Sequence, residues 1–147
     1  MEYSMGLRNL FTSYDKKKRR SLFKNLFAVA RADGKVDRDE MDLVVGLAEK
    51  FHMSTDEVTK IIRDPDSVAL VTPKTQEERV EHLYDLVSVM MVDGKIDEKE
   101  LFLCKSLAVK LGCGEETIDS LIRDLIEQAM KGIEPGKAVE RVINKYP

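Results

Sequence analysis

Two acidic turns of nearly the same sequence are the strongest candidates for chemistry in this chain. Residues 32–40 read ADGKVDRDE, and residues 92–100 read VDGKIDEKE. Each turn holds three carboxylates at matching positions: Asp33, Asp37 and Glu40 in the first turn, and Asp93, Asp97 and Glu100 in the second. Carboxylate oxygens are the ligands that hard cations such as Ca²⁺, Mg²⁺ and Mn²⁺ prefer. Both turns are therefore candidate divalent-cation sites.

Helix capping alone explains most of each turn. Gly34 suits the left-handed conformation that often follows a helix. Asp37 is a good N-cap for the next helix, and Glu40, three residues later, completes a capping box. The second turn repeats this pattern at the aligned positions. On these residues the structural interpretation and the cation interpretation both stay open.

Asp33 and Asp93 are the residues that capping does not explain. Each is predicted at the C-terminal end of a helix, where the macrodipole is negative and an unpaired carboxylate costs roughly 0.3–1 kcal/mol. The same unfavourable residue occurs in both turns. Lys35 and Lys95 offer local compensation, and a bound divalent cation is the alternative.

The turns do not fit an EF-hand. With Gly34 at loop position 6, Glu40 falls on position 12, as the EF-hand requires. Positions 1 and 3 are then Val29 and Arg31, where an EF-hand needs acidic ligands. The second turn also lacks acidic residues there, so any cation site would have fewer ligands.

The two turns belong to a longer internal repeat. Residues 22–64 align without a gap on residues 82–124, and 14 of the 43 pairs are identical. Each copy has three stretches with apolar residues at helical spacing. We therefore predict a duplicated three-helix unit, with repeat units at about 20–64 and 80–131.

Capping signals mark further helix boundaries. Ser54 and Glu57 are spaced as a capping box. After the linker between the copies, Thr72 or Thr75 is expected to cap the next helix. Near the C-terminus, EPGK opens a short final helix over about residues 135–146.

The fold prediction is all-α. Because no segment alternates with period two for long enough to form a strand, we expect only helices. The chain of 147 residues is long enough to bury one core. We predict a single globular helical domain over residues 1–147, built from two pseudo-symmetric three-helix units and containing about seven helices.

Composition limits the classes of function. The formal net charge of -3 argues against a dedicated nucleic-acid binder. No apolar run is long enough to span a membrane and no signal peptide is present, so a cytoplasmic location is expected. Cys104 and Cys113 lack nearby histidines, which indicates reduced thiols rather than a zinc site or a disulfide framework.

One basic run stands apart from the acidic remainder. It consists of Lys16, Lys17, Lys18, Arg19 and Arg20. Such a run can bind phosphate, an acidic membrane surface or an acidic partner. The alternative, which we favour, is a solvated turn at a helix start. Because the rest of the chain is acidic, self-association through this run also stays open.

The paired turns resemble the TerB-like family, which is named for a tellurite-resistance protein. The residues that carry the resemblance are Ala32, Asp33, Gly34, Val36 and Glu40 in the first turn, and Asp93, Gly94, Ile96 and Glu100 in the second. It covers about residues 20–130. The resemblance implies an all-α duplicated domain of bacterial stress systems, with acidic residues proposed to bind divalent metal and no established catalytic activity.

The functional expectation is a binding module rather than an enzyme. The sequence shows no arrangement of a nucleophile with a base and no glycine-rich phosphate loop. We expect a non-enzymatic, cytoplasmic helical module that binds divalent cations at its acidic turns in a stress-response context. The alternative is a protein-interaction scaffold whose acidic turns are purely structural. In either case the expected partner is another protein.

Overall fold

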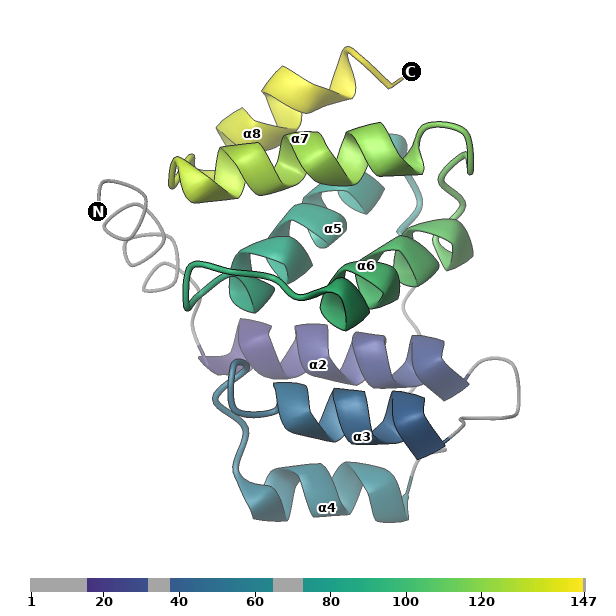
Figure 1. Cartoon of the computed structure of the whole chain (residues 1–147), viewed down its shortest axis with the longest axis vertical. Coiled ribbons are helices and arrows are strands. Elements are labelled where there is room, and N and C mark those ends of the chain that lie inside the picture. Colours follow the sequence, from purple (N-terminus) through teal and green to yellow (C-terminus); the bar gives the residue numbers. More distant parts are fainter. Residues whose placement is uncertain (1–15, 32–37, 65–72, 147) are drawn as a thin grey trace. The chain divides into compact units, whose positions relative to one another are not determined.

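Helices make up all the regular secondary structure that the structure describes. The computed structural model describes residues 16–31, 38–64 and 73–146. These residues form seven α-helices and no strand, as predicted (Figure 1). They divide into two compact units, with the described residues of 16–64 in one and residues 73–146 in the other. The boundary between them lies in the linker between the predicted repeats, and the single-domain organisation stays a prediction.

The first unit contains α2 (Lys16–Arg31), α3 (Arg38–Leu47) and α4 (Thr55–Arg63). Phe23 of α2 and Phe51, which follows α3, pack edge to face with ring centroids 5.6 Å apart. The other buried side chains of this unit include Leu22, Leu26, Phe27, Val44, Leu47, Val58 and Ile61. The two rings are therefore part of the buried apolar core.

The start of α4 confirms the predicted capping box. Glu57 N donates to Ser54 Oγ at 3.2 Å, and Ser54 N donates to Glu57 Oε1 at 3.3 Å. These two bonds satisfy backbone N–H groups that a helix start leaves without intrahelical partners. The boundary is therefore decided by residues three positions apart.

The second unit contains α5 (Gln76–Met90), α6 (Glu98–Lys110), α7 (Ile118–Met130) and α8 (Pro135–Ile143). Helix α5 contacts each of the other three. Residues 83–90 of α5 are buried without exception, which is typical of a helix surrounded on all faces. Of the two predicted caps for this helix, Thr75 is confirmed, since Glu78 N donates to its Oγ1 at 3.0 Å, and Thr72 lies outside the described residues.

Polar groups inside this unit have specific partners. The Tyr84 hydroxyl donates to Ile133 O at 2.5 Å, which ties the centre of α5 to the turn between α7 and α8. Burial raises the pKa of Tyr84 well above its ordinary value. Both cysteines are free thiols, and the buried Cys104 Sγ lies 3.2 Å from Met90 Sδ.

Two of the three pairs of helix starts follow the predicted repeat, and the third pair, Thr55 of α4 and Ile118 of α7, does not. The starts of α2 and α5, Lys16 and Gln76, are 60 residues apart, as are those of α3 and α6, Arg38 and Glu98. His52 has a φ of 55°, and the aligned Gly112 has a φ of 97°. The shared left-handed conformation supports the alignment, although the duplication and its pseudo-symmetric packing stay predictions. The final helix is shorter than predicted and ends at Ile143, with Asn144 as its C-cap.

Candidate functional site

The second acidic turn connects α5 to α6, and the structure describes all of it. Gly94 has a φ of 87°, the left-handed conformation that favours glycine. Glu100 N donates to Asp97 Oδ1 at 2.8 Å, and Asp97 N donates to Glu100 Oε1 at 3.1 Å. This is the predicted capping box of α6. Asp97 and Glu100 are therefore both used to start a helix, and Glu100 is only 5% exposed.

Asp93 also has a local role. Its Oδ1 accepts a hydrogen bond from Lys95 N at 3.3 Å. An aspartate that accepts from the backbone two residues later is typical of a turn. The helix macrodipole acts most strongly within the last helical turn. Helix α5 ends at Met90, so Asp93 lies beyond that turn. The hydrogen bond from Lys95 N therefore stabilises the Asp93 carboxylate without a bound cation.

The acidic residues do not converge in the described part of the chain. No group of three His, Cys, Asp or Glu side chains there is arranged to hold a metal ion. Asp33 and Asp37 of the first turn lie outside the described residues, and only the backbone of Glu40, in α3, is described. The cation-binding roles of these six residues stay predictions.

The basic run forms the first turns of α2. Arg20 Nε lies 2.5 Å from Glu57 Oε2, the same glutamate that completes the capping box of α4. Arg20 therefore links α2 to the start of α4. Lys17 is exposed, while Lys18 and Arg19 are half-buried and have partners of their own. The side chain of Lys16 is outside the described residues, and the binding role of the run stays a prediction.

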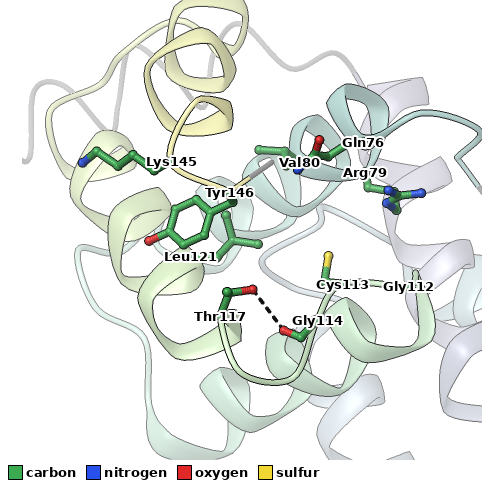
Figure 2. A pocket seen from close by; sticks show the side chains of 10 residues that line it. All are labelled: Gln76, Arg79, Val80, Gly112, Cys113, Gly114, Thr117, Leu121, Lys145 and Tyr146. Atoms are coloured by element: carbon green, nitrogen blue, oxygen red, sulfur yellow. Dashed lines mark hydrogen bonds between the residues drawn. The ribbon is translucent and has the colours of Figure 1, made fainter.

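A cavity of about 420 Å³ lies in the α5–α8 unit, which we name the Cys113 cavity. Figure 2 shows the Cys113 sulfur directed toward a space between the start of α5 and the side chains of Leu121 and Tyr146. Its lining residues are Gln76, Arg79, Val80, Gly112, Cys113, Gly114, Thr117, Leu121, Lys145 and Tyr146.

Two of the lining residues, Cys113 and Tyr146, interact with charged neighbours. Burial raises the pKa of the half-buried Cys113 thiol, and the positive charge of Arg79 partly offsets this rise. The Tyr146 hydroxyl donates to Asp124 Oδ2 at 2.7 Å, which holds the segment after α8 against α7. The lining combines apolar side chains with a thiol and cationic groups.

Sequence reasoning did not find this cavity. Its lining comes from residues 76–80, 112–121 and 145–146, and none of these stretches carries a recognisable motif. Cys113 was expected to be a reduced thiol, and the structure places this free thiol, half-buried, at the cavity wall. Only the packing of α5, α7 and the segment after α8 brings these residues together.

Comparison with known proteins finds one similarity, in the first part of the chain. Residues 1–63 match the family model described as tellurite resistance protein TerB. This N-terminal part is TerB-like. The match confirms the resemblance to the TerB-like family, and it includes the first acidic turn but not the second. No curated protein and no solved structure matches the chain.

The helices that the structure describes differ from membrane spans. Within the described ranges, none is both long enough and apolar enough to cross a bilayer.

The capping box of α6 predicts a specific response to substitution at Asp97. We expect Asp97→Ala to lower the free energy of unfolding by about 1 kcal/mol, because Glu100 N loses its side-chain acceptor. Asp97→Asn should be close to neutral, because asparagine is an equally good N-cap. Urea unfolding measures both values. Equal losses for the two variants would contradict the capping role.

Proposed function

We propose that the chain is a non-enzymatic TerB-like module that acts by binding another protein, and that its acidic turns are structural. The observation that carries this proposal is the reciprocal bonding of Asp97 and Glu100 in the capping box of α6. Both carboxylates accept from backbone N–H groups, and Asp93 accepts from Lys95 N. The chemistry of the second turn is therefore accounted for without a ligand.

The family match supports a stress-response context for this proposal. The matched family is described as a tellurite resistance protein, so we propose that the chain serves a tellurite-resistance or related stress system. The lack of a nucleophile–base arrangement in the sequence supports a binding role over an enzymatic one. The proposed location is the cytoplasm.

Two exposed apolar side chains on α6 support a protein partner. Phe102 is 67% exposed and Val109 is 42% exposed. Residues seven positions apart lie on the same side of a helix, so these two side chains share one face, with the polar Lys105 and Ser106 between them. The aligned residues of the first copy are Asp42 and Glu49, so this exposed apolar pair occurs in only one of the two copies.

Cation binding at the first acidic turn is the second candidate function. It is favoured by one observation, which is that the family match covers Asp33, Asp37 and Glu40 but stops before the second turn. These residues would supply the oxygen ligands that Ca²⁺, Mg²⁺ or Mn²⁺ take. The two turns of this chain would then differ in role despite their similar sequences.

Calorimetric titration with Ca²⁺, Mg²⁺ and Mn²⁺ tests both candidates. The structural proposal expects no heat of binding and no rise in melting temperature for the wild type. Asp93→Asn should also keep its stability within about 0.5 kcal/mol, because the asparagine carbonyl oxygen can still accept from Lys95 N.

Matched variants separate the two turns. Binding that is lost in Asp33→Asn and retained in Asp93→Asn would establish the cation function at the first turn. Binding that is lost in Asp93→Asn would overturn the structural interpretation of the second turn.

A further inference from the structure

Arg79 brings a cationic side chain to the lining of the Cys113 cavity, and none of the lining residues is acidic. The backbone N of Arg79 donates to Thr75 O at 3.0 Å, but its side chain has no hydrogen-bond or ion-pair partner among the described residues. Lys145 also lines the cavity, but its Nζ lies 3.8 Å from Asp124 Oδ2 and, in Figure 2, on the far side of Tyr146 from Cys113. The available positive charge is therefore that of Arg79.

A guanidinium in this setting favours an oxyanion. Its planar set of N–H donors matches the geometry of a carboxylate or a phosphate. The start of α7 adds to the positive character of the site. Thr117 Oγ1 donates to Gly114 O at 3.1 Å and does not cap α7, so the first amide groups of that helix have no side-chain acceptor.

The other walls favour an organic ligand over a bare inorganic anion. Val80 and Leu121 are buried apolar side chains, and the Tyr146 ring lies beside Leu121 (Figure 2). The cavity volume of about 420 Å³ is within the range of small-molecule sites. An apolar body would contact these walls, and a charged end would reach Arg79.

We propose that the Cys113 cavity binds a small carboxylate that has an apolar body, with the carboxylate paired to Arg79. The residues that line this cavity include none from the acidic turns or the basic run. Its specificity comes from one charge and an apolar wall, as in other small-molecule pockets.

The thiol of Cys113 provides a direct reporter for this site. The Cys113 thiolate attacks the methylene carbon of iodoacetate or iodoacetamide, so that an S–C bond forms and iodide leaves. Cys104 is fully buried, so alkylation of the folded chain reports on Cys113, as peptide mapping would verify. Iodoacetate is itself a small carboxylate, whereas iodoacetamide is its neutral counterpart.

The first measurement is the ratio of the two alkylation rates at one pH. We expect Arg79→Gln to lower the ratio of iodoacetate to iodoacetamide rates by roughly threefold or more, because local charge concentrates the anionic reagent. A change in thiolate population cancels in this ratio. Arg141→Gln is the matched control, because Arg141 is exposed on α8 and bonds to Gln128 rather than lining the cavity. An unchanged ratio in Arg79→Gln would overturn the proposal.

The second measurement uses the wild type and does not depend on any variant folding. Millimolar benzoate should slow alkylation of Cys113 by iodoacetamide, and benzamide should not. Equal protection by the two compounds, or none by benzoate, would show that Arg79 does not select an anion. If inorganic phosphate protected Cys113 as strongly as benzoate does, the apolar part of the ligand would not contribute to binding, which would contradict the proposal.

Discussion

The Phe51→Ala variant is expected to lose about 3–5 kcal/mol of unfolding free energy, the largest effect that we predict. Phe51 is fully buried and packs edge to face on Phe23 within the α2–α4 unit. The substitution removes apolar contacts, leaves a cavity and breaks the aromatic pair. Since small domains have a total stability of only about 5–15 kcal/mol, this loss would leave the unit close to unfolding. Urea unfolding followed by circular dichroism measures it.

Phe102→Ala is the matched control for this prediction. It makes the same chemical change on α6, where the phenylalanine is 67% exposed. A surface substitution of this kind should change stability by no more than about 0.5 kcal/mol. Similar losses for the two variants would mean that Phe102 is covered in the folded protein, or that Phe51 is not part of a buried core.

Leu125→Ala should have the next largest effect, with a loss of about 2–5 kcal/mol. Leu125 is fully buried on α7, the helix that contacts α5, α6 and α8. Its truncation leaves a cavity in the core of the α5–α8 unit. Val109→Ala, in the same unit but 42% exposed, is the control and should be nearly neutral.

Hydrogen exchange on Leu125→Ala also tests the predicted single domain. A single cooperative domain should lose protection by the same free energy in α2–α4 and in α5–α8. A loss confined to α5–α8 would contradict this prediction and show two separately folding units. Phe51→Ala provides the reciprocal experiment from the other unit.

The helix boundaries that sequence predicted correctly share one property, which is that their signals are local. The capping boxes at Ser54 and Asp97 each join residues three positions apart. Their bonds form wherever the chain enters a helix, so they can be recognised without a tertiary structure. The end of α8 was predicted less well. Tyr146 bonds to Asp124, 22 residues earlier, a long-range contact that no local pattern signals.

The role of Asp93 shows the limit of a purely local argument. The sequence predicted this carboxylate at the C-terminal end of a helix, where the macrodipole is unfavourable. It left two candidates that could compensate for this effect, a bound cation or Lys95. The structure adds a backbone N–H, that of Lys95, and places Asp93 beyond the end of α5. A shift of a few residues in a helix end is enough to change which partner the carboxylate meets.

Sequence by itself determined the helical class and most helix starts, because apolar spacing and capping act over a few residues. It also indicated the TerB-like resemblance, which the family match supports over residues 1–63. Only the tertiary structure decided that Tyr84 of α5 would bond to Ile133, and that Arg79 and Cys113 would line one cavity with Tyr146. These groups come from segments far apart in the chain. These groups come together only when α5, α7 and α8 pack. The energy of that packing is the sum of many small contacts, so no single sequence motif predicts it.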